Sequence, residues 1–379
     1  MIIDARADDA PVWEEVAPKH AGFDPDRLAE AVEYAATSES DWPRSMRADD
    51  GRFIGCVEIG DRPPYDMPLG PVTPRGPANG LVLRGGRLVA EWGDTRHADM
   101  TFSIAKSYLA LLAGLAVDRG LIGGLDALVA ATVEDGGFDD AHNRSITWRH
   151  LLEQTSEWHG TLFDRPDQVD WHRVVGAADT PAARARKGEP RTLQPPGTHF
   201  EYNDVRVNRL ALSLLRVFGR ALPELLADEV MGPIGASSTW RWDAYQNATV
   251  DVAGTPMPSV PGGGHWGGGL VIAARDHARV GELVVAGGRW DGRQIVSSEW
   301  VRAMLTPSAI APIYGLMWWL NTDRALYPSA PKTSAFALGA GSNILWVDPA
   351  LDLVVVLRWV RKAVAGEVIG RFAAALTER

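Results

Sequence analysis

The sequence predicts an α+β protein in which an antiparallel sheet, flanked by N- and C-terminal helices, carries an inserted and mostly helical domain. Three observations favour this α/β sandwich. Strand-like hairpins lie near both ends of the 379-residue chain, helical stretches lie between them, and strand-like runs are scarce in that middle region. The alternative, a parallel doubly wound sheet, needs a repeated alternation of strands and helices that the sequence lacks.

The N-terminal part predicts one helix and one hairpin. Residues 24–37 show helical spacing of apolar side chains, and Asp24 is placed to cap the helix. The stretch 38–79 is rich in Pro and Gly, so we expect a loop. Residues 81–84 and 87–92 read as two strands joined by a two-glycine turn.

The rest of the chain predicts helices followed by a second hairpin. Helical patterns cover 103–119, 147–154, 207–217 and 223–230, a hairpin covers 343–347 and 353–360, and a closing helix covers 363–376. If the two hairpins pair, residues 1–100 and 270–379 form the α/β domain and residues 101–269 form the helical domain. We then expect the active site at the interface of the two.

Composition excludes several classes of partner. The formal charge is −10, without a basic run, so nucleic acid is not expected to bind. The aliphatic stretch 104–117 is too short to cross a bilayer, and Met1–Glu15 lacks the apolar core of a secretory signal. Cys56 is the single cysteine, so we expect a cytoplasmic protein in which it is a small buried side chain.

Three motif tests come out negative. The glycine run 262–267 matches a dinucleotide-binding pattern but does not follow a strand, so it indicates close backbone packing instead. The histidines lack zinc-ligand spacing, and His150 is expected to be structural. No Gly-x-Ser-x-Gly motif occurs. We therefore expect no cofactor and no metal.

One motif carries chemistry. Ser103 and Lys106 form a Ser-x-x-Lys at the start of the most apolar helical stretch. Residues three apart lie on one face of a helix, so the two side chains can meet. An apolar environment disfavours the charged form of lysine, which lets lysine act as a base toward a serine hydroxyl. Only five of the 38 basic residues are lysines, and Lys106 is the one expected to be buried. A structural lysine whose ammonium reaches solvent is the alternative.

A series of segments in the same order resembles the serine β-lactamase and penicillin-binding-protein superfamily. It resembles the branch that holds class C β-lactamases, family VIII esterases, D-aminopeptidases and 6-aminohexanoate-oligomer hydrolases. The similar segments span about residues 80–360 and comprise 99–107 with the Ser-x-x-Lys, 146–156, 195–204 with a tyrosine signature, 267–276 and 346–349. The resemblance implies a β-lactamase/transpeptidase-like form of the split fold described above.

The resemblance also implies roles for three residues. Ser103 would be the nucleophile that accepts the acyl group, and Lys106 would activate it. Tyr202 would carry a proton between the serine oxygen and the leaving amine or alcohol, because an amide nitrogen leaves badly unless it is protonated. Without the resemblance, a core tyrosine is the simpler interpretation of Tyr202.

The sequence departs from the superfamily pattern at two places. Asp204 is a candidate for substrate contact, but it stands where the family usually has Asn, and an ionised Asp cannot donate a hydrogen bond to a substrate amide. The third signature lacks a clean match. Lys332-Thr333-Ser334 is displaced, and Lys332 is expected at the surface. Residues 339–343 align better and suggest a substrate-binding turn with an oxyanion hole made by the N–H groups of Ser103 and Ala340, with Gly341 and Ser342 beside it.

Tryptophans lie next to these signatures. Trp158, Trp266, Trp318 and Trp319 could line an apolar cleft, and Trp158 is the candidate for substrate contact. For any one of fifteen tryptophans, packing in the core or between domains is the alternative.

These observations favour a serine hydrolase that cleaves a small-molecule amide or ester through an acyl-enzyme. The alternatives are a catalytically weak or silent binding module with the same fold and a true β-lactamase or D-aminopeptidase. The oligomeric state leaves no trace in the sequence.

Overall fold

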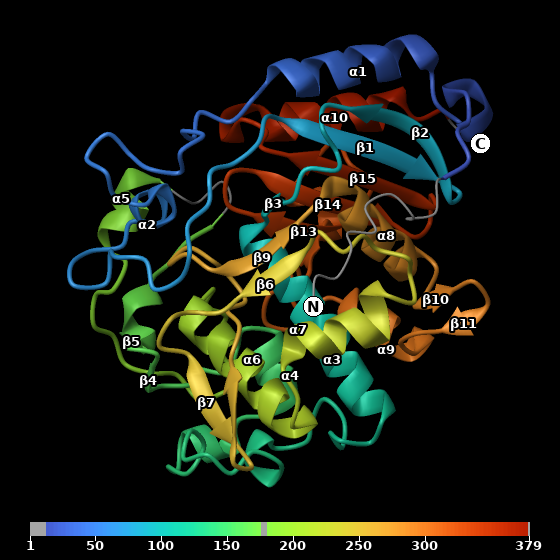
Figure 1. Ribbon diagram of the computed structural model, residues 1–379. Coiled ribbons are helices and arrows are strands. Elements are labelled where there is room, and N and C mark those ends of the chain that lie inside the picture. The colour runs from blue at the N-terminus through green and yellow to red at the C-terminus, as the bar shows by residue number, and fades with distance from the viewer. Residues whose placement is uncertain (1–12, 176–179, 378–379) are drawn as a thin grey trace, which may run out of the picture.

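The computed structural model describes residues 13–175 and 180–377, and its centre is a six-stranded antiparallel sheet (Figure 1). The strand order is β12-β13-β14-β15-β1-β2. The strands are β12 (Trp319–Leu320), β13 (Ala335–Gly339), β14 (Asn343–Asp348), β15 (Leu353–Arg358), β1 (Asn79–Arg84) and β2 (Arg87–Trp92). Strand β1 pairs with β15, so that Val82 faces Val355. The two predicted hairpins therefore form one sheet, as expected.

Helices cover both faces of this sheet. Helices α1 (Pro25–Thr37) and α10 (Ala365–Ala375) lie side by side on one face, while α8 (Ala274–Val285) lies on the other (Figure 1). The Asp24 side chain accepts hydrogen bonds from the backbone N–H groups of residues 26 and 27, which caps α1 as predicted. Leu28 and Phe372 bury their side chains in the core that these two helices share with the sheet. The predicted α+β fold class is confirmed.

The rest of the chain forms a mostly helical layer below the sheet in Figure 1. Helix α3 runs through this layer with every residue from 105 to 116 buried, which agrees with its apolar sequence. Helix α6 packs against α3. The helices are α2 (Ile54–Ile59), α3 (Ala105–Asp118), α4 (Trp148–Leu152), α5 (Pro181–Ala185), α6 (Asp204–Phe218), α7 (Leu222–Leu226) and α9 (Ser298–Met304).

Short strands complete the molecule. A three-stranded sheet has the order β3-β9-β6, and three small hairpins lie elsewhere. The bounds are β3 (Asp99–Met100), β9 (Gly269–Ile272), β6 (Arg241–Asp243), β4 (Thr161–Leu162), β5 (Arg165–Pro166), β7 (Thr249–Val252), β8 (Thr255–Pro258), β10 (Arg289–Trp290) and β11 (Arg293–Gln294).

Several elements were not predicted. The stretch expected to be a loop contains α2, and neither α8 nor β13 was expected. Strand β13 depends on tertiary packing, whereas α8 has an amphipathic sequence whose buried face packs on the sheet. Helix α8 approaches the sheet closely at Gly281, where a Cβ atom would lie 2.5 Å from Val354 Cγ1. Strand β13 is short and gains its order by pairing with β14.

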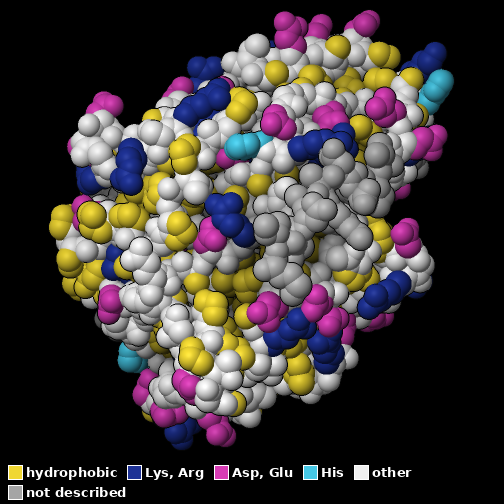
Figure 2. All heavy atoms as spheres, viewed as in Figure 1, with side chains coloured by type: hydrophobic (Ala, Val, Ile, Leu, Met, Phe, Trp, Pro, Cys, Tyr) yellow, Lys and Arg dark blue, Asp and Glu magenta, His cyan; other side chains and the backbone are white. Residues whose placement is uncertain are grey.

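The viewed surface in Figure 2 carries acidic and basic side chains interspersed, without a continuous basic area. Within the described residues, no helix combines the length and the apolar character needed to cross a membrane.

Candidate active site

Ser103 lies in a 3-10 turn, Phe102–Ile104, that leads directly into α3. Phe102 has a positive φ of 51°, a conformation that bulky residues rarely adopt. Its ring is buried and packs edge-on against Trp42 and Trp359, which holds this backbone in place. Phe102 and Ile104 are buried while Ser103 is only half-buried. The turn therefore presents the serine hydroxyl from an otherwise buried segment.

Lys106 faces Ser103 from the first turn of α3. Its Nζ donates a hydrogen bond to Ser103 Oγ at 2.8 Å and another to the Gly262 carbonyl oxygen at 3.3 Å. The side chain is 1% exposed. The predicted burial of Lys106 and its contact with Ser103 are both present.

The sequence suggested apolar surroundings for Lys106. The structure differs, because the Asp204 carboxylate lies beside the lysine. Asp204 Oδ1 lies 2.6 Å from Lys106 Nζ, and both side chains are buried. Asp204 begins α6, and Asn203 caps that helix with its side chain. We expected Asp204 to face the substrate, and this expectation is corrected: its carboxylate points to the lysine and to two further buried groups.

Those two groups are Arg173 and His265. Arg173 Nη1 lies 3.0 Å from Asp204 Oδ2, and His265 Nδ1 lies 2.5 Å from the same oxygen. Burial disfavours the charged carboxylate, but Arg173, Lys106 and His265 outweigh it and hold the pKa of Asp204 well below its usual range. Asp204 is therefore ionised in the site.

The ring of Tyr202 packs next to Lys106. The Lys106 ammonium lies 4.7 Å from the centre of its ring, and the Arg173 guanidinium lies 5.1 Å from it. The ring also packs against Trp319, with centroids 5.4 Å apart. The Ser103–Lys106 pair, Tyr202 and Asp204, which lie in separate segments of the sequence, are thus brought together at one place.

The charged cluster extends beyond these residues. It contains Lys106, Asp204, Arg173, Asp170, Lys187, Asp61 and His265. Lys187 pairs with Asp61 and, at 3.1 Å, with Asp170. The expectation that Lys106 alone among the lysines is buried is wrong, because Lys187 is 5% exposed. The scarcity of lysine in this arginine-rich chain was the one sequence signal that pointed to Lys187.

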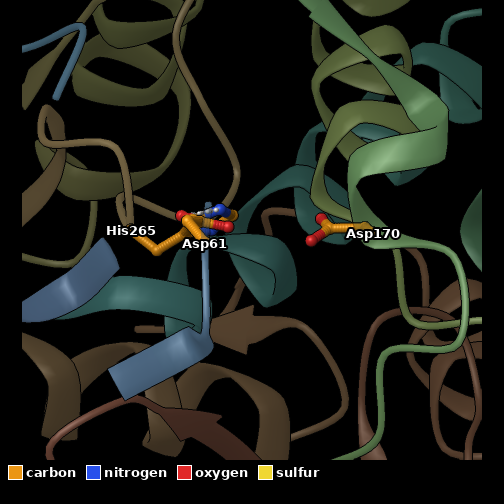
Figure 3. A group of neighbouring side chains, drawn as sticks. All are labelled: Asp61, Asp170 and His265. Carbon is orange, nitrogen blue, oxygen red and sulfur yellow. Dashed lines mark ion pairs between the residues drawn. The ribbon is translucent and has the colours of Figure 1, made fainter. Parts of the chain in front are cut away.

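Three members of this cluster could in principle hold a metal. Ligand atoms of Asp61, Asp170 and His265 lie within 4.8 Å of one another, and Figure 3 shows Asp170 facing the other two. The Lys187 side chain, which that figure does not draw, already supplies the cation between the two carboxylates. Since an ammonium and a metal ion would compete for the same oxygens, we assign no metal to this cluster.

The turn between β13 and β14 lies against the Ser103 turn. A Cβ atom on Gly339 would lie 2.1 Å from the Thr101 carbonyl oxygen, so only glycine permits this approach. The Ala340 carbonyl accepts a hydrogen bond of 2.8 Å from Asn343 Nδ2. Gly341 and Ser342 both have positive φ, at 74° and 54°. The proposed substrate-binding turn is therefore next to the serine, and its residues 339–342 are half-buried.

Trp158 is placed differently from the expectation. Its side chain belongs to the main core, and its indole N–H donates to the Gly137 carbonyl at 2.7 Å. The contacts of the site described above do not include it, so we assign it to packing. Trp266 and Trp318 are fully buried core residues.

Three other residues have structural roles. His150 closes a capping box with Thr147 at the start of α4. Lys332 is exposed at the surface, as expected. Cys56 is free and buried, and its thiol contacts the His265 carbonyl oxygen at 3.1 Å.

A half-buried serine paired with a buried lysine at the start of a helix, beneath an antiparallel sheet, indicates the class to which this protein belongs. The Beta-lactamase family model matches residues 80–375, so the chain is a member of that family and a serine hydrolase.

The chain is also similar to particular proteins, and the two solved structures among them show the likeness of fold. A 6-aminohexanoate-dimer hydrolase from Paenarthrobacter ureafaciens is 26% identical in an alignment of 309 positions that covers 73% of this chain and 70% of the relative. A penicillin-binding-protein homologue from Caulobacter crescentus has a similar structure, with a TM-score of 0.59, 18% identity and coverage of 94% of this chain and 99% of the homologue. A family VIII carboxylesterase has a TM-score of 0.55, 16% identity and coverage of 79% of this chain and 92% of the esterase.

Proposed function

We propose that this protein hydrolyses a small amide or ester through an acyl-enzyme on Ser103. The observation that carries the proposal is the 2.8 Å hydrogen bond between buried Lys106 and half-buried Ser103. A nucleophile and a base within hydrogen-bond reach are what covalent hydrolysis requires.

The reaction takes two steps in this site. Ser103 Oγ bonds to the substrate carbonyl carbon while its proton passes to the Lys106 amine. The bond to the leaving amine or alcohol then breaks, and the leaving group takes that proton by way of Tyr202. A water molecule attacks the acyl-enzyme along the reverse route, which releases the acid and restores Ser103.

The negative charge on the former carbonyl oxygen of the tetrahedral intermediate is stabilised by hydrogen-bond donors. We assign this oxyanion hole to the backbone N–H groups of Ser103 and Ala340. The close approach of Gly339 to Thr101 supports the assignment, because it brings the two turns into contact.

The substrate class follows from two kinds of support. The relatives include an enzyme named for an amide dimer of 6-aminohexanoate and a carboxylesterase. Lys332, the nearest match to the lysine of the third signature, is exposed, and Asp204 contacts Lys106. The chain therefore lacks two polar groups that the superfamily pattern places around a β-lactam, and we favour linear amides and esters.

One observation favours a second candidate, a catalytically silent binding module. Three oxygen atoms lie within 3.3 Å of Lys106 Nζ, and one of them is the Asp204 carboxylate. This arrangement suits the ammonium, whereas the base must be the neutral amine. The hydrolase requires that one proton leave Nζ before Ser103 attacks.

An acylation experiment separates the two candidates. A p-nitrophenyl ester is expected to give a burst of nitrophenol, and a serine-directed phosphonate is expected to label the Ser103 peptide in mass spectrometry. Ser103→Ala should lose both signals. Turnover that persists unchanged in Ser103→Ala, with no adduct on Ser103, would rule the hydrolase out. Parallel assays with 6-aminohexanoate dimer and nitrocefin then rank linear amides against β-lactams.

A further inference from the structure

The glycine run 262–267 lies directly beneath the Ser–Lys pair. The Gly262 carbonyl accepts a hydrogen bond from Lys106. A Cβ atom on Gly262 would lie 2.3 Å from Val207 Cγ1, and one on Gly263 would lie 2.5 Å from Asp204 Oδ2. These contacts explain the glycines, because the run must pass against the first turns of α6. The segment that failed as a cofactor motif therefore belongs to the floor of the site.

His265 is held from several sides within this run. Its ring lies 3.8 Å from that of Trp266, centroid to centroid, and its side chain is 1% exposed. Nδ1 contacts Asp204 at 2.5 Å, and Nε2 lies 3.4 Å from Asp61 Oδ2. No contact between His265 and Ser103 or Lys106 is present in the described part of the chain. Asp204 is the side chain that contacts both His265 and Lys106, so it is the direct side-chain link between the histidine and the Ser–Lys pair.

The Asp204 carboxylate joins the two halves of this arrangement. Its Oδ1 contacts Lys106, and its Oδ2 contacts His265 and Arg173. An asparagine, the usual residue here in the family that the sequence resembles, has a single acceptor oxygen and could not serve both sides. The two oxygens of the Asp204 carboxylate are therefore suited to contact Lys106 on one side and His265 and Arg173 on the other.

We infer that His265 and Asp204 form a relay of positioning residues: His265 fixes the Asp204 carboxylate, and Asp204 fixes Lys106 Nζ against Ser103 Oγ. The inference rests on the proposed hydrolase. Apart from His265, the cluster holds equal numbers of basic and acidic side chains, since Lys106, Arg173 and Lys187 oppose Asp204, Asp170 and Asp61. Loss of the histidine leaves Asp204 free to turn toward Arg173, which draws it away from the lysine.

Two substitutions at one position test the relay. His265→Leu removes the N–H donor to Asp204, whereas His265→Asn keeps a donor close to the place of Nδ1. We expect His265→Leu to slow the burst phase with p-nitrophenyl acetate by about 10- to 100-fold, because a misplaced catalytic group costs rates of that order. The dissociation constant Ks, taken from the dependence of the burst rate on substrate concentration, is expected to change by less than about threefold, since both residues act on Lys106 and not on substrate binding. His265→Asn is expected to recover most of the acylation rate.

The measurements are made per active site, titrated with the serine-directed phosphonate, so a loss of folded protein does not count as a loss of rate. His142→Ala is the control, because His142 contacts the Glu157 carbonyl and not Asp204. If the wild type shows a burst and His265→Leu is acylated at the same rate as the wild type, the relay is overturned. Wild-type turnover that persists in Ser103→Ala, with no phosphonate adduct on Ser103, would instead overturn the proposed hydrolase.

A second variant covers the case in which His265→Leu does not fold. Asp204→Asn keeps the size of the side chain but removes its charge and one acceptor. Slower acylation by at least about tenfold supports the relay. An acylation rate equal to that of the wild type overturns it, because Asp204 would then have no part in placing Lys106.

Discussion

The carboxylate of Asp204 lies 2.6 Å from the ammonium of Lys106, and both side chains are buried. Breaking a buried ion pair by removing one partner leaves an uncompensated charge, which is costly. The lysine that faces Ser103 is thus part of a network whose members cannot be changed one at a time without consequence. The predictions below concern this network and two further carboxylates, the buried Glu157 and the half-buried Glu282.

Replacement of Lys106 by arginine is expected to abolish most activity. Arginine keeps the positive charge opposite Asp204 but does not lose its proton near neutral pH, so it cannot act as a base. We expect kcat/KM to fall by about 10³- to 10⁵-fold, measured with a p-nitrophenyl ester. Lys332→Arg is the matched control, because Lys332 is exposed. Near-normal activity of Lys106→Arg would mean that the lysine contributes charge alone.

Gly263→Ala is expected to damage the site through a clash. The added Cβ atom would lie 2.5 Å from Asp204 Oδ2, so the carboxylate or the backbone must move. Overpacking of this kind costs about 1–3 kcal/mol of unfolding free energy, and we expect acylation to slow as Asp204 shifts. Denaturant unfolding and burst kinetics measure the two effects. Gly123→Ala is the control, since a Cβ atom there meets only Ala127 Cβ at 3.6 Å.

Glu157 is expected to stabilise the fold at neutral pH. Burial opposes its ionisation, but Arg191 and Arg206 bind the carboxylate and lower its pKa from 4.5 to about 2. Because the folded pKa lies below the unfolded one, this stability is present above about pH 4.5 and is lost as the pH falls toward 2. Glu157→Gln should reduce the free energy of unfolding at pH 7 by about 2–3 kcal/mol.

Urea unfolding at several pH values checks this prediction. The difference between wild type and Glu157→Gln should shrink as the pH is lowered through that window. A difference that stays constant from pH 7 to pH 3 would show that the carboxylate charge is not its source.

Glu282 in α8 is expected to act in the opposite direction. Burial raises its pKa to about 7, although Trp13 donates a 2.6 Å hydrogen bond to it. A raised folded pKa means that stability is lost as the pH rises from about 4.5 to 7. Glu282→Gln should therefore raise Tm at pH 8 and increase the unfolding free energy by about 1 kcal/mol.

The same variant should have little effect at pH 4, where the carboxyl is protonated in both states. Glu33→Gln serves as the control, because Glu33 is exposed. A lower Tm for Glu282→Gln at pH 8 would contradict the expected sign.

Local patterns in the sequence were sufficient for much of the fold. Asp24 capping α1, the hairpin of β1 and β2 and the apolar helix α3 all depend on neighbours close in the chain. Helix α8 was not predicted although its sequence is amphipathic, and strand β13 was not predicted because it is ordered by pairing with β14. The position of the Trp158 side chain was not predicted for a similar reason, since the sequence does not show on which side of a loop the indole lies.

The sequence by itself determined that Ser103 meets Lys106, because residues three apart on a helix share one face whatever the rest of the molecule does. It also indicated, through the scarcity of lysine, that Lys106 has a special role. Only the tertiary structure decided what surrounds that lysine. Asp204 begins a different helix, His265 lies in a glycine run, and Asp61 and Lys187 come from further segments. Contacts between distant segments depend on packing, which no local spacing encodes.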